Sequence, residues 1–276
     1  MKIKFIVLTG VLILLVLLFN SSEKKDVIEF DPLEVEIGQE FTQVKTDKPK
    51  IVLNYAFFDT TGDSKNNMII IIGEKAEEEM FYKNIDLVLY DAYSQSFMQK
   101  NLRNYQGGVI KISNADFDGD SISEIMITSD NLDKTKNIRI VKNNSGDLIE
   151  LFGEKTNKGV NGTGNFLDGF RGVIYLKDFN KEVVYDLEDY KENYISSGFF
   201  AENGKLLSDK KKITTSNFTE IELIELSKSF GIKTKQKIKG FDNLDILDEI
   251  EVLWKYENGR WIPCEANSLK HGNLLY

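Results

Sequence analysis

The stretch Asp116-Phe-Asp-Gly-Asp-Ser-Ile-Ser-Glu124 places four carboxylates within nine residues and leads directly into the apolar segment Ile125-Met-Ile-Thr128. Apolar, β-branched residues after a turn predict a β-strand. Carboxylates at alternate positions of a tight turn repel one another unless a cation lies between them. Because Ca²⁺ accepts about six to eight oxygen ligands, the sequence predicts a calcium loop that feeds a strand.

The expected calcium ligands are the carboxylates at loop positions 1, 3, 5 and 9 and the carbonyl at position 7, namely Asp116, Asp118, Asp120, Glu124 and Ile122. An EF-hand is excluded, because its twelfth position is a glutamate followed by a helix and here it is Ile127 in an expected strand. Position 6 is Ser121 instead of the usual turn glycine. The alternative is that the acids only form hydrogen-bonded Asx turns without metal.

A weaker copy of this loop lies 57 residues earlier, with Asp59 aligned on Asp116. Its candidate ligands at positions 1, 3, 5 and 9 are Asp59, Thr61, Asp63 and Asn67. Two of the four are carboxylates, so this loop either binds calcium weakly or serves as a hydrogen-bonded turn. Repeats of roughly this length indicate an array in which each unit needs its neighbours to bury its faces.

Short apolar runs separated by Gly, Asn or Asp predict strands over most of the chain after residue 50. The expected strands are 51–58, 68–72, 85–90, 108–112, 125–128, 138–141, 172–176, 183–185, 221–226 and 250–256. No window has a long capped helical period. The chain is therefore expected to be mainly β, a propeller-like array of short antiparallel sheets with an undetermined number of blades.

The two loops resemble the FG-GAP/VCBS repeats of the integrin alpha amino-terminal β-propeller. The segments that begin at Asp59, Phe81, Ala115 and Lys237 are similar to successive segments of the VCBS repeat-containing exported proteins of Firmicutes, over about residues 50–262. The resemblance implies a propeller whose calcium loops link neighbouring strands, and it implies no catalytic residue. Asn67 and Ser121 depart from the pattern, and the region around "TEIELIELSKSFGIK" lacks an Asp-rich loop.

The amino-terminal segment has the pattern of an export signal, with Lys2 and Lys4 followed by an uncharged run from Phe5 to Phe19. As a helix the run would span about 22 Å, short of the roughly 30 Å hydrocarbon core, which favours a cleaved signal peptide. No small-x-small cleavage motif follows, which favours an uncleaved transmembrane signal anchor. In both cases the rest of the chain is expected outside the membrane.

The expected organisation is a signal anchor or peptide at 1–20, a spacer or first edge strand at 21–49, the propeller-like domain at 50–264 and a tail at 265–276. The net charge of −9 argues against a nucleic-acid partner. A single cysteine, Cys264, excludes an internal disulfide.

Four further groups are weaker candidates. The glycines between 159 and 172 do not match a phosphate loop and are expected in a flexible loop. Cys264 and His271 do not make a nucleophilic pair on sequence evidence. Trp254, Tyr256 and Trp261 flank an expected Asn-Gly hairpin turn, where packing is favoured over ligand stacking. The acids Asp242, Asp245, Asp248 and Glu249 are either a cation or sugar site or a solvated loop.

Three functions remain open from the sequence. The first is a calcium-stabilised, non-enzymatic binding module that holds protein or glycan at the cell envelope. The second is a hydrolase of envelope polymer that uses two carboxylates about 5 to 9.5 Å apart. The third is a structural spacer or sensor ectodomain.

Overall fold

The computed structural model describes residues 30–208, 212–242 and 244–273. The chain divides into two compact units, residues 1–35 and 36–276. The first unit is described only at residues 30–35, which contain the 3-10 turn Pro32–Glu34. The expected signal or transmembrane segment at 1–20 lies outside the described residues. Across the described ranges, no helix is both long and apolar enough to cross a membrane.

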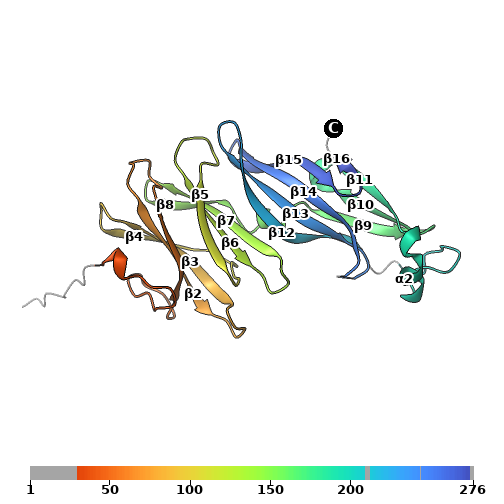
Figure 1. The fold of residues 1–276 in the computed structure, drawn as a ribbon, viewed down its shortest axis with the longest axis horizontal. Helices are drawn as coiled ribbons and strands as arrows, with labels where there is room; N and C mark the ends of the chain where they lie inside the picture. The colour runs from red at the N-terminus through yellow and green to blue at the C-terminus, as the bar shows by residue number, and fades with distance from the viewer. Residues whose placement is uncertain (1–29, 209–211, 243, 274–276) are drawn as a thin grey trace, which may run out of the picture. The chain divides into compact units, whose positions relative to one another are not determined.

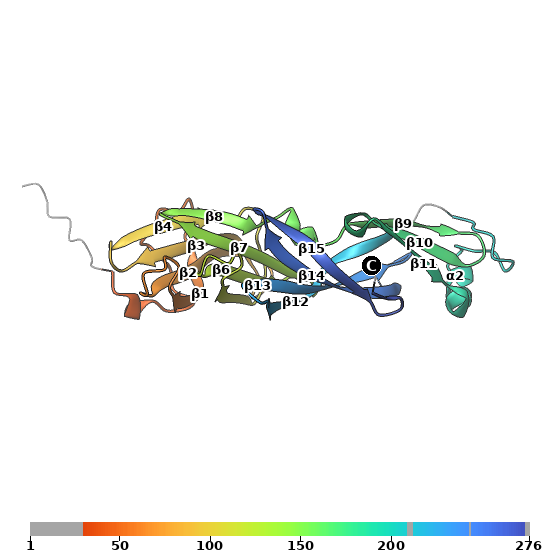
Figure 2. The same cartoon turned by 90° about the horizontal axis from the view of Figure 1, so that it is seen from above.

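The second unit is built from antiparallel strands in three sheets (Figure 1, Figure 2). The first sheet has the order β1 (Ile51–Phe58), β2 (Asn67–Lys75), β3 (Tyr82–Asp91), β4 (Ser96–Asn101). The second sheet has the order β5 (Ile110–Ala115), β6 (Glu124–Asp130), β7 (Lys136–Asn144), β8 (Asp147–Phe152). These two sheets are copies of one up-and-down arrangement.

The third sheet has eight strands in the order β11–β10–β9–β12–β13–β14–β15–β16. Their bounds are β9 (Gly162–Leu167), β10 (Arg171–Leu176), β11 (Lys181–Asp186), β12 (Ile213–Glu225), β13 (Phe230–Lys239), β14 (Ile246–Glu257), β15 (Arg260–Ser268) and β16 (Gly272–Asn273). The described helical segments of this unit are short: η2 (Thr156–Lys158), η3 (Lys177–Phe179), η4 (Glu188–Tyr190) and α2 (Lys191–Ser196).

The expectation of a mainly β chain with antiparallel sheets is confirmed, whereas the propeller is wrong. After two four-stranded sheets, the described strands do not form a further separate blade. β9 pairs with the start of β12 at Ile213 and Thr214, and this pairing joins β9–β11 to the following strands in one continuous sheet. Two copies of a loop therefore indicated a local repeat but not a closed ring of like sheets.

The central strands of the second sheet, β6 and β7, are buried on both faces. Ile125 and Ile127 of β6 share a hydrophobic cluster with Ile69 and Ile71 of β2 in the first sheet. Met126, which lies between them and points to the opposite face, belongs to the cluster that the third sheet lines. A strand covered on both faces has a continuous apolar sequence instead of an alternating one, which explains the run in β6.

Strand β2 is buried in the same way, with Ile69, Ile70, Ile71 and Ile72 all fully inaccessible to solvent. The segment before β1 approaches the first sheet on the face that carries Asp86, the register partner of Ile72. Lys50 Nζ lies 2.6 Å from Asp86 Oδ2, and both side chains are buried. Within the expected spacer, residues 38–41 hydrogen bond with the start of β1.

The glycine-rich stretch, expected as a flexible loop, instead contains β9 and the start of β10. At Gly164 the two strands approach so closely that a Cβ atom would lie 2.0 Å from the carbonyl oxygen of Val173. A backbone oxygen cannot move aside as a flexible side chain can. Glycine is therefore needed for this strand pairing.

We predict that Gly164→Ala lowers the free energy of unfolding by about 2 kcal/mol or more, because the added methyl group overlaps the backbone of β10. Urea denaturation of the purified full chain measures the change. Thr163→Ala, at the exposed neighbouring position, is the control and should change stability by less than about 0.5 kcal/mol. Equal effects of the two substitutions would refute the steric explanation.

Candidate metal centre

Both acidic loops connect the first two strands of a sheet. The first loop, Asp59–Asn67, joins β1 to β2, and the second loop, Asp116–Glu124, joins β5 to β6. A Cβ atom on Gly62 would lie 3.0 Å from the Ile122 side chain, so the two loops are direct neighbours.

In the second loop, the first aspartate holds the backbone turn. Asp116 Oδ1 accepts a hydrogen bond from the Gly119 N–H at 2.7 Å, and Oδ2 accepts one from the Ser121 N–H at 2.9 Å. Gly119 and Ser121 both have left-handed backbones, with φ of 80° and 69°. Ser121 thus adopts the conformation that the missing turn glycine would favour, and the bond to Asp116 supports it.

The first loop has the same hydrogen-bond pattern. Asp59 accepts from the N–H groups of Thr61 (2.9 Å), Gly62 (2.8 Å) and Ser64 (2.7 Å). Burial by itself would raise the pKa of Asp59, but these N–H groups outweigh it and hold the pKa below its usual range. Gly62 and Ser64 again have left-handed φ of 78° and 64°. The internal repeat is therefore a repeat of conformation as well as of sequence.

Position 9 of each loop is buried and also closes the turn. Glu124 Oε2 accepts from the Phe117 N–H at 2.7 Å, and Asn67 Oδ1 accepts from the Thr60 N–H at 3.1 Å. Asn67 Oδ1 also accepts from the Thr60 hydroxyl at 2.8 Å. The side-chain oxygen of Asn67 therefore already accepts two hydrogen bonds within the loop.

The second loop differs because a lysine from β7 reaches into it. Lys142 Nζ lies 2.5 Å from Asp118 Oδ2 and 2.5 Å from Asp120 Oδ2. The same nitrogen lies 3.4 Å from Glu124 Oε1. An ammonium group of the protein itself therefore lies among three of the predicted metal ligands.

Sequence reasoning missed Lys142 because it is 18 residues beyond Glu124 and in a different strand. The pairing of β6 with β7 places it, since Ile125 is opposite Val141 and Lys142 follows. In the first sheet, Met68 is opposite Tyr90, so the residue at the corresponding position is Asp91. The two loops thus share a backbone, but the third strand of the sheet has Lys142 at this position in one case and Asp91 in the other, whose carboxylate accepts from the Tyr93 N–H and the Ser94 hydroxyl.

Burial, hydrogen bonds and neighbouring charges shift the pKa values of three groups in the second loop. Burial opposes ionisation of both Asp120 and Lys142. Lys142 and the Ile122 N–H outweigh it and lower the pKa of Asp120, while Asp118 and Asp120 outweigh it and raise the pKa of Lys142. Glu124 behaves differently, because burial is the largest influence and raises its pKa to about 7. The nearby Asp118 raises that pKa further, while the Phe117 N–H and Lys142 lower it.

Glu124 has no exposed surface, and its Oε1 has no hydrogen bond among the described residues. Its contact with Lys142 at 3.4 Å is an ion pair that is longer than an ordinary N–H···O hydrogen bond. The centre therefore contains a fully buried carboxylate that is only partly neutralised.

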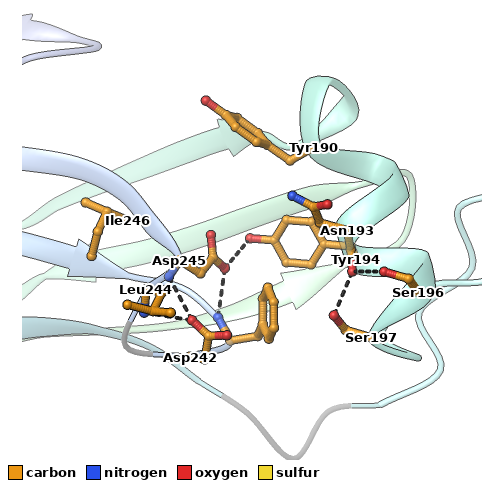
Figure 3. A pocket seen from close by; sticks show the side chains of 10 residues that line it. Tyr190, Asn193, Tyr194, Ser196, Ser197, Asp242, Leu244, Asp245 and Ile246 are labelled. Carbon is orange, nitrogen blue, oxygen red and sulfur yellow. Dashed lines mark hydrogen bonds between the residues drawn. The ribbon is translucent and has the colours of Figure 1, made fainter.

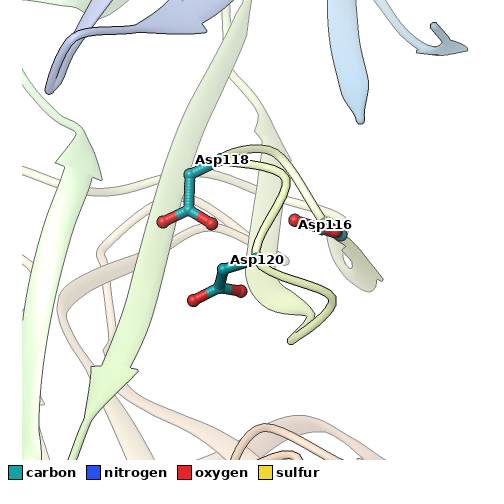
Figure 4. A group of neighbouring side chains, drawn as sticks. All are labelled: Asp116, Asp118 and Asp120. Carbon is teal, nitrogen blue, oxygen red and sulfur yellow. The ribbon is translucent and has the colours of Figure 1, made fainter. Parts of the chain in front are cut away.

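The arrangement could accommodate a cation on geometric grounds. One carboxylate oxygen from each of Asp116, Asp118 and Asp120 lies within 4.8 Å of the others, and Figure 4 shows the three side chains on the one loop. These are oxygen ligands of the kind that Ca²⁺ prefers. Lys142 contacts two of them, so an ion would have to displace the ammonium or share its carboxylates.

The remaining predicted ligands have other contacts. Ile122, whose carbonyl oxygen is the predicted ligand, donates its N–H to Asp120 Oδ1 at 2.9 Å. In the first loop, the Thr61 hydroxyl donates to Asp59 at 3.1 Å, and Asp63 accepts from the Lys65 N–H at 2.9 Å. The described residues of the first loop thus form a hydrogen-bonded turn.

The second loop also forms a junction with the third sheet. The Phe230 N–H, at the start of β13, donates to the Asp116 carbonyl oxygen at 2.8 Å. The Phe117 ring packs edge-on against Trp261 of β15, with centroids 5.4 Å apart. The metal candidate thus lies where the second sheet contacts the third.

The weaker candidates are placed as follows. Trp254 and Trp261 are buried in the core on either side of the expected Asn258-Gly259 turn, so the packing interpretation is confirmed. Cys264 Sγ donates to the Leu253 carbonyl oxygen, while the His271 ring contacts Tyr185, so these two side chains do not interact.

The acids after β13 bind tyrosine hydroxyls. Asp245 Oδ2 accepts from Tyr194 at 2.6 Å, and Asp248 Oδ2 accepts from Tyr185 at 3.2 Å. Asp245 also lines a cavity of about 430 Å³ between α2 and the loop after β13 (Figure 3). Sequence reasoning did not find this cavity, because its aromatic wall is about 50 residues away from its acids.

Comparison with known families finds a match only over part of the chain. The family described as YybI C-terminal domain matches residues 160–269, which contain β9–β15. No curated protein matches the chain.

Two solved structures are similar to the chain at low identity. The exotype rhamnogalacturonan lyase YesX has 14% identity and a TM-score of 0.38, covering 85% of this chain and 36% of that one. The Bacillus licheniformis rhamnogalacturonan lyase PL11 has 13% identity and a TM-score of 0.36, covering 82% and 36%. This chain thus corresponds to about a third of the length of each lyase.

These findings correct the family resemblance. The FG-GAP/VCBS assignment over about residues 50–262 is wrong, since the family that matches is the YybI C-terminal domain at 160–269. The integrin-like propeller is wrong with it. The resemblance rested on short acidic turns, and a turn of this kind forms wherever an aspartate accepts the N–H groups that follow it.

We predict that Glu124→Gln removes a pH dependence of stability. A carboxyl group with a raised folded-state pKa binds more protons when folded, so its contribution falls as pH rises from about 4.5 to about 7. Thermal melts should show that the wild-type chain loses on the order of 2 to 3 kcal/mol relative to Glu124→Gln across that range. Glutamine keeps an acceptor for the Phe117 N–H. Parallel pH profiles of the two proteins would contradict the raised pKa.

Proposed function

We propose that this chain is an exported, non-enzymatic binding module of the cell envelope, stabilised by a cation at its second acidic loop. The observation that carries the proposal is that Asp116, Asp118 and Asp120 each place a carboxylate oxygen within 4.8 Å of the others, beside the buried Glu124. With its acids held by an ammonium and by backbone N–H groups, the loop is suited to fixing the junction between sheets. The basic and apolar start of the chain supports export.

Calcium is the proposed cation. Together with Asp116, the cluster has four carboxylates and one lysine, so negative charge remains after the internal ammonium is counted. A divalent ion that binds the folded loop would add its binding free energy to folding, about 2.7 kcal/mol at a hundredfold excess over its dissociation constant. Calcium outside the cell would then stiffen the contact of the second sheet with the third.

The proposed partner is a protein or glycan of the envelope, and the proposal involves no nucleic acid. The net charge of −9 supports the exclusion of nucleic acid. Crosslinking at the surface of intact cells would identify the partner, and recovery of cytoplasmic proteins alone would contradict an extracellular location.

We predict that Ca²⁺ raises the melting temperature of the full chain, purified in a mild detergent, by about 5 to 10 °C relative to EGTA. The double substitution Asp118→Ala, Asp120→Ala should abolish the shift. Lys142→Met should melt lower than wild type in EGTA, because three acids lose their counter-charge, and should gain more from Ca²⁺.

Asp63→Ala in the first loop is the matched control, since Asp63 occupies the loop position that Asp120 has in the second loop. It should leave the Ca²⁺ shift of the melting temperature within about 2 °C of the wild-type value. If Ca²⁺ stabilises neither the wild type nor Lys142→Met, the calcium proposal is wrong. If Asp63→Ala abolishes the shift, the ion binds the first loop instead.

A further inference from the structure

The cavity introduced above lies outside the acidic loops, and we call it the tyrosine pocket. It is formed by η4, α2 and residues 241–242 and 244–246 between β13 and the start of β14. The lining residues are Tyr190, Asn193, Tyr194, Ser196, Ser197, Phe241, Asp242, Leu244, Asp245 and Ile246. Its volume of about 430 Å³ is that of a small-molecule site.

The aromatic wall of the tyrosine pocket is fixed in place. Tyr194 is almost fully buried and donates its hydroxyl to Asp245 Oδ2 at 2.6 Å. Burial and then Asp245 raise the pKa of Tyr194 well above its usual value, so the hydroxyl remains a donor. The Phe241 ring packs against Tyr194 with centroids 5.1 Å apart, and the Phe241 N–H also donates to Asp245 Oδ2 at 2.9 Å.

The two carboxylates are held by the backbone in a similar way. Asp242 Oδ1 accepts the N–H groups of Leu244 at 2.7 Å and Asp245 at 2.8 Å. Among the described residues, the other oxygen of each carboxylate accepts no hydrogen bond. Figure 3 shows Tyr190 across the pocket from the Asp245–Tyr194 pair. Each acid thus accepts hydrogen bonds from the protein through one oxygen and has a second oxygen that a ligand could contact.

The charge of the tyrosine pocket points to the class of ligand. Two carboxylates line it, and no lysine, arginine or histidine is among its lining residues. Tyr190 is 49% exposed. The ammonium of Lys270 lies 5.5 Å from the centroid of its ring, so a ligand cation would contact the part of the ring that Lys270 does not cover. An aromatic face beside uncompensated carboxylates attracts a cation and repels an anion.

We propose that the tyrosine pocket binds a small organic cation, an alkylated or quaternary ammonium group that contacts Tyr190 and is neutralised by Asp242 and Asp245. The inference gives a ligand class to the proposed binding role and rests on that role. It does not involve the calcium centre, so a failure of the calcium melts and a failure of this inference are distinguishable.

Calorimetric titration of the full chain with choline chloride tests the proposal, with 3,3-dimethylbutan-1-ol as the neutral molecule of the same shape. Choline should bind at least about fivefold more tightly than the alcohol. The preference should shrink as NaCl is raised, because salt screens an exposed carboxylate. Equal affinities, binding of the alcohol alone or no binding of choline would overturn the proposal.

Asp242→Asn removes one charge but keeps an oxygen that can accept the N–H groups of Leu244 and Asp245. It should weaken choline binding about fivefold without lowering the melting temperature, and Tyr190→Leu should weaken it by a similar factor. The control is Asp147→Asn, which makes the same charge change at the exposed start of β8 and should leave affinity unchanged. Equal losses in Asp242→Asn and Asp147→Asn would mean that only net charge matters and would overturn the site.

Discussion

The burial of β6 and β7 on both faces of the second sheet is the constraint on which the acidic loop depends. Because β6 begins at Glu124 inside this sheet, a carboxylate is placed where it has no contact with water. One of its oxygens accepts the Phe117 N–H, which closes the loop, and the other faces Lys142. The backbone of the loop, the ion pairs and the contact with β13 therefore form one connected arrangement.

In the two loops, the residues that fix the backbone of the turn are different from those that set the charge around it. The first aspartate and the left-handed residues at positions 4 and 6 are the same in both, so the backbone is the same. The side chain that reaches the acids of the second loop comes from the third strand, where Lys142 occupies the position that Asp91 has in the first sheet. A repeat can thus keep its conformation while the side chains around it change.

Local features of the chain could be predicted from sequence, because neighbouring residues determine them. They include most strands, the Asn258-Gly259 hairpin turn and the conformational match of Asp59 with Asp116. Features that depend on pairing between strands far apart in the sequence could not be predicted in this way. Lys142 reaches the loop through the β6–β7 register, and Ile213 joins β9 to β12. Likewise, Asp245 and Asp248 accept hydrogen bonds from tyrosines that lie more than 50 residues earlier in the sequence.

Strand β2 has a consequence for the behaviour of the unfolded chain. Its segment Met68-Ile-Ile-Ile-Ile72 is uncharged, lacks proline and is almost entirely β-branched, which are the properties of segments that assemble into intermolecular β-structure. In the folded protein β2 lies between β1 and β3, so both of its hydrogen-bonding edges are occupied. The native pairing of β1 therefore protects the chain from aggregation as well as completing the first sheet.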